Sequence, residues 1–175
     1  MRLQKYGATL ESLTAKDLEL VRQWRNSDHV RETMQYRDLI AVASQQSWFN
    51  SLDKSKNLYF VIYAGRKKTG VVNLKDINLE EGVAEAGIFI GEKEFLNTTV
   101  PVAATVLIME FAFGELKLNR LKAKISVENH KAIRFNEGLG YIKDADQQGA
   151  FAYYPVTQER FAISVNNLVK TLEKL

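Results

Sequence analysis

The stretch from Val83 to Asn136 decides the fold: VAEAGIFIGEKEFLNTTVPVAATVLIMEFAFGELKLNRLKAKISVENHKAIRFN. Residues 83–92 combine β-branched, aromatic and small side chains, which is typical of a strand. The apolar run 102–113 suits a helix that is buried on several sides. Residues 121–127 alternate apolar with polar side chains, as a half-buried strand does, and residues 130–138 predict a short helix. The stretch therefore predicts strand, buried helix, strand and helix in that order.

The rest of the chain predicts further strands and helices around this stretch. Thr14 suits a helix N-cap, and Asp17 three residues later completes an approximate capping box. The basic residues Arg66, Lys67 and Lys68 are interpreted as a solvated turn between two strands. The predicted elements outside the stretch are a strand at 6–13, a helix at 14–26, a short helix or pair of helices reaching 46–52, a hairpin of strands 58–63 and 71–78, a strand at 150–156 and a last amphipathic helix at 160–175.

Length and composition predict one globular domain over residues 1–175. A chain of 175 residues buries one core of ordinary size and is too short for two independent ones. Hydrophobic residues make up 46% and charged residues 26%, the balance of a globular protein and not of a disordered one. No repeat or Pro/Gly/Ser-rich linker interrupts the chain.

Composition also limits the location and the partners that we expect. The start, MRLQKYGATLESL, lacks the apolar core of a signal peptide and no run is long enough to span a bilayer, so we expect a cytoplasmic protein without a membrane partner. The chain has no cysteine, which excludes a thiolate nucleophile, and no His/Asp/Glu spacing typical of a metal site. A formal charge of +3 with scattered basic residues predicts no nucleic-acid binding.

The order of elements over residues 83–136 resembles the core of the GNAT superfamily of acyl-CoA N-acyltransferases, and the resemblance covers most of the chain. It implies an α/β (α+β) fold, the GNAT fold, with a mixed, mostly antiparallel central sheet flanked by helices. It also implies an enzyme that moves an acetyl group from acetyl-CoA to a primary amine. Direct attack of the amine on the thioester needs no metal.

The amino-terminal half carries the resemblance to particular GNAT groups. Trp24, Arg25 and Asn26, followed by Met34 and Trp48, look like enzymes that acetylate nucleotide-linked amino sugars and like ribosomal-protein alanine acetyltransferases. In both groups this region forms one wall of the acceptor site, which implies substrate binding by all five residues. Core packing is the alternative for the two tryptophans, and a favourable helix dipole is the alternative for Arg25. A nucleotide-linked 4-amino sugar is the first expected acceptor and a protein amino terminus the second.

The loop that would hold the CoA pyrophosphate departs from the family pattern. GNAT members dock this group on a Gln/Arg-x-x-Gly-x-Gly/Ala loop at a helix N-terminus. The equivalent residues 97–103 read NTTVPVA, with Thr99 and Pro101 in place of the glycines. Proline has no N–H, so Pro101 removes one amide donor. The cofactor contacts that the resemblance assigns to this loop are the hydroxyls and amides of Thr98, Thr99, Val100, Val102 and Ala103.

The resemblance also assigns the chemistry. Glu85 in A-E-A-G matches the glutamate that accepts the amine proton in many members, although a plain ion-pair partner is the alternative. Asn136 replaces the tyrosine that usually protonates the departing thiolate, and an amide cannot do so. Tyr141, assigned first, or Tyr153, Tyr154 or a water would take that role. The remaining cofactor contacts assigned by resemblance are Ile88, Ile90, Asn129 and Asn136.

A second class of function stays open beside the enzyme. A GNAT-fold protein that has lost cofactor binding could serve as a binding module, and the missing glycines and tyrosine fit that history. In that case side chains such as Phe95 or Val100 should fill the cleft between the two central strands. A homodimer is a further expectation for either class.

Overall fold

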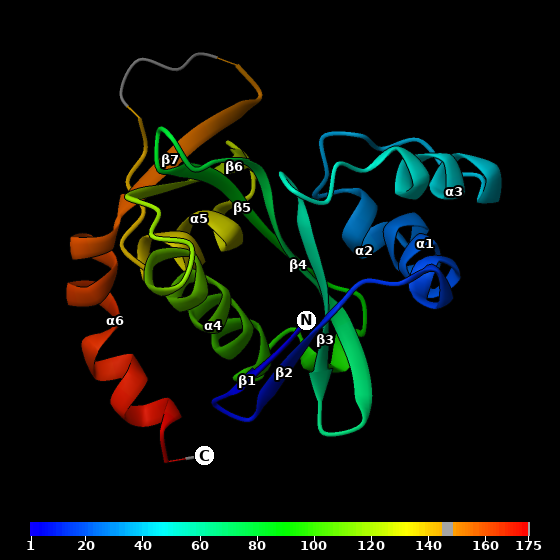
Figure 1. Cartoon of the computed structure of the whole chain (residues 1–175). Helices are drawn as coiled ribbons and strands as arrows, with labels where there is room; N and C mark the ends of the chain where they lie inside the picture. Colours follow the sequence, from blue (N-terminus) through cyan, green and yellow to red (C-terminus); the bar gives the residue numbers. More distant parts are fainter. Residues whose placement is uncertain (145–148, 175) are drawn as a thin grey trace.

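The computed structural model describes residues 1–144 and 149–174. Within that part of the chain, seven strands form one sheet in chain order, and every neighbouring pair is antiparallel except β5 and β6, which are parallel (Figure 1). The strands are β1 (Arg2–Lys5), β2 (Ala8–Ser12), β3 (Leu58–Ala64), β4 (Lys67–Asn78), β5 (Val83–Ile90), β6 (Arg120–Ser126) and β7 (Phe151–Thr157). The expected mixed, mostly antiparallel sheet is confirmed.

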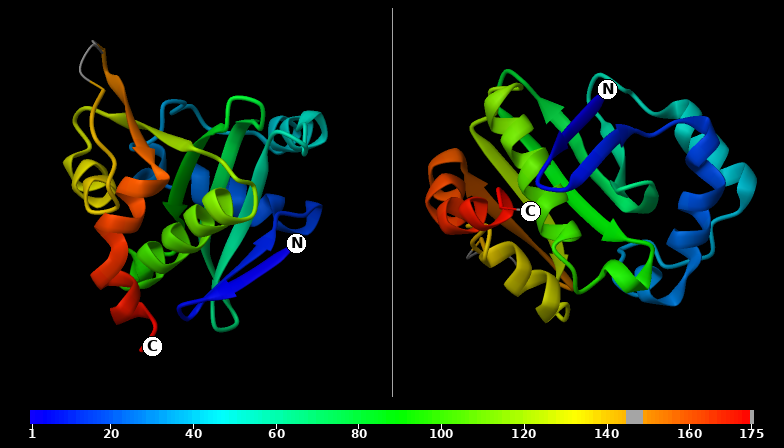
Figure 2. Two further views of the ribbon diagram at one scale, coloured as in Figure 1. Left: turned by 60° about the vertical axis from the view of Figure 1, so that its left-hand side comes forward. Right: turned by 90° about the horizontal axis from the view of Figure 1, so that it is seen from below.

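Helices cover both faces of the sheet, with α1–α3 on one face and α4–α6 on the other (Figures 1 and 2). The helices are α1 (Leu18–Asn26), α2 (Asp28–Arg31), α3 (Val42–Ser51), α4 (Val100–Gly114), α5 (His130–Glu137) and α6 (Gln158–Leu172), with 3-10 turns η1 (Ala15–Asp17) and η2 (Lys93–Phe95). The main core lies between the sheet and α4 and α6, and a smaller core lies under α1 and α3. Because successive strand residues point to opposite faces, one strand serves both cores.

The parallel pair β5 and β6 is joined only over a short length. Val83 pairs with Arg120, Ala84 with Leu121 and Glu85 with Lys122. No pairing between these two strands follows beyond Glu85 in the described residues, although β5 continues to Ile90. The two strands therefore diverge from Glu85 onward and leave a gap in the middle of the sheet.

The predicted first strand is wrong at its start. Residues 6–13 were expected to form one strand, but Tyr6 and Gly7 make the turn between β1 and β2, with φ of 59° and 74°. The side chain of Tyr6 is held there because its hydroxyl donates to Glu110 Oε1 of α4 at 2.6 Å. A contact with α4, distant in sequence, therefore places a turn where local propensity favours a strand.

The predicted turn after β3 is also too long. Gly65, with φ of 59°, and Arg66 make the turn, while Lys67 and Lys68 belong to β4. Lys68 Nζ pairs with Asp17 Oδ1 at 2.7 Å, so it is not a solvated turn residue. The carboxylate side of the predicted capping box is confirmed, since Asp17 Oδ2 accepts from the amide and the hydroxyl of Thr14.

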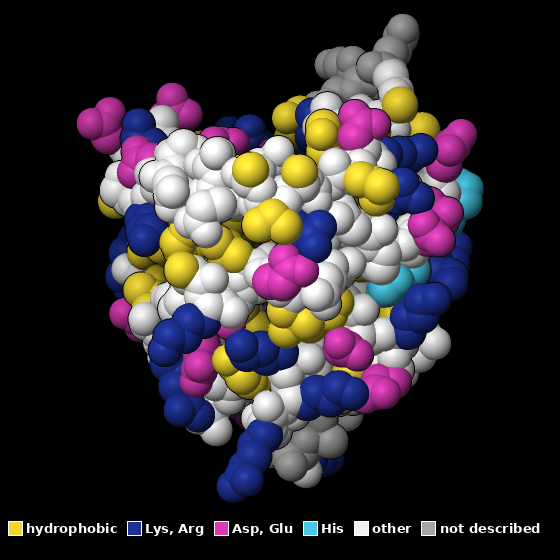
Figure 3. All heavy atoms as spheres, turned by 90° about the vertical axis from the view of Figure 1, so that its right-hand side faces the viewer, with side chains coloured by type: hydrophobic (Ala, Val, Ile, Leu, Met, Phe, Trp, Pro, Cys, Tyr) yellow, Lys and Arg dark blue, Asp and Glu magenta, His cyan; other side chains and the backbone are white. Residues whose placement is uncertain are grey.

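The other predicted elements are present with shifted ends. The helix expected to reach 46–52 is α3, which begins earlier at Val42, and α2 is the other member of the pair. The last helix runs over Gln158–Leu172, and the predicted end at Leu175 lies outside the described residues. Within the described residues no helix has the length and apolar character needed to cross a membrane. On the face formed by α1–α3, basic, acidic and hydrophobic side chains are interspersed (Figure 3).

Candidate active site

A cavity of about 600 Å³ passes through the sheet at the gap between β5 and β6. Its lining includes Phe89, which packs in the smaller core under α1 and α3. It also includes Ala86, Ala123 and Ile125, which belong to the main core against α4. Because neighbouring residues of one strand point to opposite faces, the cavity is lined by residues from both faces of the sheet.

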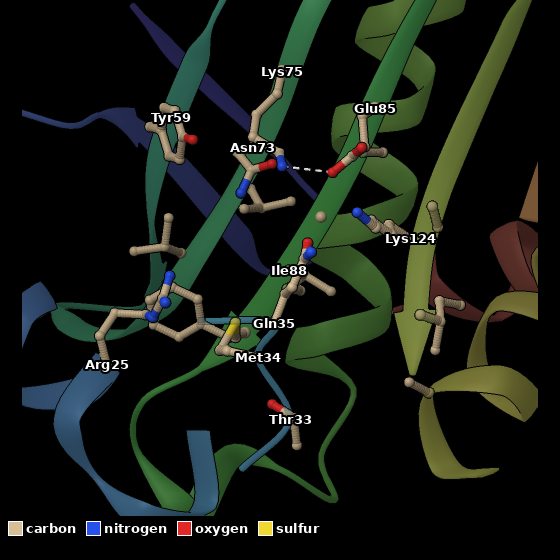
Figure 4. Close-up of a pocket in the computed structure, with 18 of the residues that line it drawn as sticks. Arg25, Thr33, Met34, Gln35, Tyr59, Asn73, Lys75, Glu85, Ile88 and Lys124 are labelled. Carbon is tan, nitrogen blue, oxygen red and sulfur yellow. Dashed lines mark ion pairs between the residues drawn. The ribbon is translucent and has the colours of Figure 1, made fainter. Parts of the chain in front are cut away.

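The wall on the α1–α3 side has rows of aligned residues. Tyr59, Asn73 and Gly87 face one another across β3, β4 and β5, and Lys75 lies opposite Glu85 in the next row (Figure 4). All five line the cavity. Aligned residues on one face of a sheet lie within direct reach of one another. The polar wall is therefore built by strand register and not by a loop.

Glu85 is the carboxylate at the point where β5 and β6 part. Its side chain is 11% exposed, and Oε1 pairs with Lys75 Nζ at 2.5 Å (Figure 4). Lys124 of β6 lies across the gap from it. A carboxylate on a cavity wall is one of the side chains that can accept a proton. The ion pair, which was the alternative expected for Glu85, is present as well.

Arg25 is a half-buried cation on the cavity wall. Its Nε is buried and has no hydrogen-bond partner among the described residues, and none of the ion pairs in that part of the chain includes Arg25. Burial lowers the pKa of its guanidinium, while nearby Tyr59 acts in the opposite direction. Burial likewise raises the pKa of Tyr59 to about 12, with Arg25 opposing it. Arginine stays charged under these conditions, so this wall carries an uncompensated positive charge.

Tyr141 lies at the main-core side of the cavity. It is 3% exposed, and its hydroxyl donates to Met109 Sδ of α4 at 3.8 Å. Burial raises the pKa of this phenol well above its ordinary value, so it is protonated at neutral pH. Tyr154, one of the alternatives, is also buried but does not line the cavity, and neither does Tyr153. The structure thus brings Tyr141 to the site.

The two asparagines of α5 line the cavity but are engaged with their own helix. Asn129 Oδ1 accepts from the amide of Ala132 at 3.1 Å, which makes it the N-cap of α5. Asn136 Nδ2 donates to the carbonyl of Ala132 at 2.8 Å. Ile88 of β5 also lines the cavity, whereas Ile90 does not. Capping, the physical alternative for Asn129, is present.

The predicted pyrophosphate loop lies outside the cavity lining. Thr98 Oγ1 accepts from the amide of Val100 at 3.3 Å, and Pro101 offers no amide. Ala103 donates to the carbonyl of Thr99 at 2.9 Å. Among the described residues this leaves the amide of Val102 without a partner at the start of α4. Three of the loop residues assigned to the cofactor therefore direct their hydrogen bonds within the loop or helix.

The five expected acceptor residues divide into two groups. Arg25, Met34 and Trp48 line the cavity. Trp24 does not; it is 5% exposed, donates from Nε1 to Glu92 at 3.0 Å, and packs where any Cβ on residue 91 would clash.

Asn26 also lies outside the lining. Its Nδ2 donates to the carbonyl of Ile40 at 3.0 Å and its Oδ1 accepts from the amide of Ile40 at 2.8 Å. Ile40 itself lines the cavity. Asn26 therefore holds the segment between α2 and α3 against the end of α1. It shapes the cavity wall indirectly, through Ile40.

Sequence reasoning missed several polar residues of the cavity, among them Tyr59, Asn73, Lys75 and Lys124. Asn73 and Lys75 alternate with the buried residues Val72 and Leu74, so the period of two marks them as one face of β4. Which strands stand beside β4, and hence which residues they meet, depends on the sheet order.

Comparison with known proteins identifies the family. A model of the acetyltransferase (GNAT) domain matches residues 8–142. The chain belongs to the GNAT acetyltransferase family. Acetyltransferase PseH of Campylobacter jejuni is 27% identical over 139 residues, which cover 77% of this chain and 84% of that protein.

Solved GNAT structures share the fold of this chain. Spermidine N-acetyltransferase from Vibrio cholerae in complex with CoA and spermine superposes with a TM-score of 0.78 at 17% identity, covering 89% of this chain and 98% of that one. A domain from Methanocaldococcus jannaschii superposes with a TM-score of 0.76 at 21% identity, covering 86% of this chain and 97% of that one. At these identities the likeness shows the GNAT fold alone.

GNAT enzymes use acetyl-CoA as the acetyl donor, and the gap fits such a donor. Beyond Glu85 the edge of β5 that faces β6 has no strand partner in the described residues, so backbone groups there are available to a ligand. Ile88, Ala123 and Ile125 give the gap an apolar lining suited to an uncharged arm. The start of α4 fits less well than the family's glycine loop, because the amide of Val102 is the one left unpaired there among the described residues.

Proposed function

We propose that this protein transfers the acetyl group of acetyl-CoA to the primary amine of an anionic small molecule, a nucleotide-linked amino sugar. The observation that carries the proposal is Arg25, a half-buried cation on the cavity wall whose buried Nε has no hydrogen-bond partner and which has no carboxylate partner in the described residues. A buried charge without a partner is costly unless a ligand supplies one. A guanidinium binds phosphate and carboxylate oxygens through directed N–H bonds.

The charges around the cavity favour the same class of acceptor. Arg25, Lys75 and Lys124 are its cationic lining residues and Glu85 is its acidic one, so the described lining has a surplus of positive charge. A polyamine would meet repulsion here, because like charges close together in a poorly solvated site disfavour binding. The diphosphate of a nucleotide sugar would be attracted. The proposed acceptor class therefore differs from the polyamine bound by the spermidine N-acetyltransferase of Vibrio cholerae.

Glu85 serves as the general base in this proposal. As the acceptor nitrogen bonds to the thioester carbonyl carbon and the C–S bond breaks, the nitrogen loses a proton to the Glu85 carboxylate. Lys75 fixes that carboxylate at the gap through their 2.5 Å ion pair. Tyr141, protonated and on the cavity wall, supplies a proton to the departing thiolate. Its bond to Met109 sulfur is a weak one, which leaves the hydroxyl free to turn.

The open gap supports an enzyme over a binding module. Phe95 and Val100, the side chains expected to fill the cleft after loss of function, pack against the main core and do not line the cavity. We further propose that residues 1–175 act as one catalytic domain, because strands from both ends of the chain, β1 and β7, belong to the same sheet.

An acetylation assay with a set of amines tests the proposal. Purified protein and acetyl-CoA are mixed with a uridine-diphosphate-linked 4-amino sugar, with spermidine, or with an alanine-initiated peptide, and thiol release is followed. We expect kcat/KM for the nucleotide sugar to exceed that for spermidine by about 100-fold, the scale that site polarity commonly sets. A preference for the peptide would favour the second candidate acceptor, a protein amino terminus. No turnover of any amine would favour the binding module.

A further inference from the structure

Two polar atoms of the cavity wall have no hydrogen-bond partner in the part of the chain that the structure describes. Among the described residues, three buried side-chain atoms are unpaired: Arg25 Nε, Asn73 Oδ1 and His29 Nδ1. Arg25 and Asn73 both line the cavity, whereas His29 does not and approaches the carbonyl of Ile90 through its other ring nitrogen at 3.2 Å. Buried polar groups in folded proteins are nearly always paired, so each exception calls for an explanation. Here two exceptions share one wall.

The strand register keeps space open beside Asn73. Asn73 lies between Tyr59 and Gly87 in its row, and a Cβ on residue 87 would lie 3.1 Å from Asn73 Oδ1 and 3.4 Å from Nδ2. Such a Cβ would crowd the amide. Because residue 87 has no side chain, the Asn73 amide is not crowded from β5, and Asn73 lines the cavity in the row next to Glu85 (Figure 4).

The two atoms have complementary hydrogen-bonding character. Asn73 Oδ1 is an acceptor, and Arg25 Nε–H is a donor that carries positive charge. Tyr59 lies in the row beside Asn73 and is the residue that opposes the lowering of the Arg25 pKa, so it lies near Arg25 as well. Figure 4 shows Arg25, Tyr59 and Asn73 on the same side of the cavity, across from Lys124. A molecule on this side can therefore give a hydrogen to one residue and accept one from the other.

We propose that Arg25 and Asn73 form a recognition subsite for the acceptor, in which Asn73 Oδ1 accepts a hydrogen bond from an N–H or O–H group and Arg25 Nε donates to an oxygen of the same molecule. The proposal rests on the proposed acetyltransferase function and narrows its substrate class. The acceptor carries a hydroxyl or secondary amide close to an anionic or carbonyl oxygen, as a sugar ring with an amide substituent does. A polyamine has no oxygen for Arg25.

The test compares Asn73→Leu and Arg25→Met with the wild type. Leucine has the same branching and the same number of side-chain heavy atoms as asparagine, and replacing an unpaired buried polar group by an apolar one of similar shape can be nearly neutral for stability. We expect Asn73→Leu to keep or raise the urea midpoint, to raise KM for the nucleotide amino sugar about tenfold, a change worth about 1.4 kcal/mol, and to leave KM for acetyl-CoA unchanged. Arg25→Met should raise the same KM further, because it removes a charge.

A conservative variant and a control separate recognition from packing. Asn73→Gln keeps the carboxamide and should recover part of the affinity that Asn73→Leu loses. Asn50→Leu, an exposed position on α3 that does not line the cavity, should change neither KM nor the urea midpoint. A fall in the urea midpoint of Asn73→Leu would overturn the proposal, because it would mean that Asn73 bonds within the protein. An unchanged acceptor KM would overturn it as well.

The outcomes also separate this subsite from the proposed function. If the wild type acetylates the peptide instead of the nucleotide sugar, the proposed acceptor class is wrong. The subsite is then tested by comparing KM for the peptide between Asn73→Leu and the wild type. If the wild type acetylates the nucleotide sugar and both variants keep its KM, the function stands and the subsite falls. If no amine is acetylated, both fall.

Discussion

Asn73 and Gly87 face each other across β4 and β5, and a Cβ on residue 87 would lie 3.1 Å from Asn73 Oδ1. That distance is tight for a carbon and an amide oxygen, so the asparagine must shift if residue 87 gains a side chain. The missing side chain keeps one wall of the cavity both open and polar. The pair therefore links a strand glycine to the shape of the candidate acceptor site.

Gly87→Ala should impair the acceptor site while leaving the fold intact. We expect KM for the amine acceptor to rise by about three- to tenfold, an effect of roughly 0.6–1.4 kcal/mol from a displaced hydrogen-bonding group, with KM for acetyl-CoA unchanged. Steady-state kinetics in both substrates measures it. The matched control is Gly114→Ala at the end of α4, where a Cβ meets nothing within 4 Å. Equal kinetics for the two variants would contradict the prediction.

Glu85→Gln should lower kcat by at least tenfold, since loss of a general base commonly costs about 100- to 10,000-fold. The amide keeps the shape of the side chain but cannot take the amine proton. Glu80→Gln, an exposed change outside the cavity, is the control and should keep full activity. Unchanged turnover of Glu85→Gln at saturating substrate and neutral pH would reduce Glu85 to the partner of Lys75.

Pro101→Gly should tighten CoA binding. The variant restores a backbone N–H in the first turn of α4, where one amide, that of Val102, is left unpaired in the described residues. One added bond to a phosphate oxygen is worth about 1 kcal/mol, or roughly fivefold in Kd. Pro101→Ala should show the same direction with less backbone freedom. Calorimetry with CoA measures both, and weaker binding in both would mean that the loop is not the pyrophosphate site.

Asp17→Asn should destabilise the fold at neutral pH but not at low pH. Burial acts to raise the pKa of Asp17, but hydrogen bonds from Lys68 and Thr14 outweigh it and hold the pKa below its ordinary value of 3.8. The carboxylate therefore stabilises the fold above about pH 4, and this stabilisation is lost as pH falls through the lower folded-state pKa.

We expect a difference of about 1–3 kcal/mol between wild type and Asp17→Asn at pH 7, the scale of hydrogen bonds to a charged group. Urea unfolding of both proteins from pH 7 down to about pH 2.5 measures it. A difference in unfolding free energy between the two proteins that stays constant over this pH range would show that Asp17 acts by packing and not through its charge.

The elements of the fold could be predicted from the sequence where local pattern and tertiary structure agree. The apolar helix α4, the alternating strand β6 and the short helix α5 are found within one or two residues of their predicted ends. The predicted strand was wrong at Tyr6, where the hydrogen bond to Glu110 of α4 stabilises a turn. The predicted solvated turn was wrong at Lys68, which belongs to β4 and forms an ion pair with Asp17. Both errors come from partners that are distant in sequence.

The site could be predicted only in part, and for a similar reason. Glu85 and Arg25 were found because single residues matched a family pattern, and both line the cavity. Asn73 was missed because its significance lies in having Gly87 opposite and an Oδ1 atom that is unpaired among the described residues, which only strand register and burial show. Trp24 was assigned to the acceptor, but it packs in the core beside Gly91.

Calorimetric titration with acetyl-CoA is the decisive experiment, because the gap between β5 and β6 must hold the donor before any amine can be acetylated. Wild type and Glu85→Gln are titrated side by side, since removing the base should spare binding. We expect a Kd on the order of 1–100 µM for both proteins, an ordinary affinity for a substrate. No heat of binding at millimolar acetyl-CoA in either protein would contradict the proposed activity and leave the cavity without its donor.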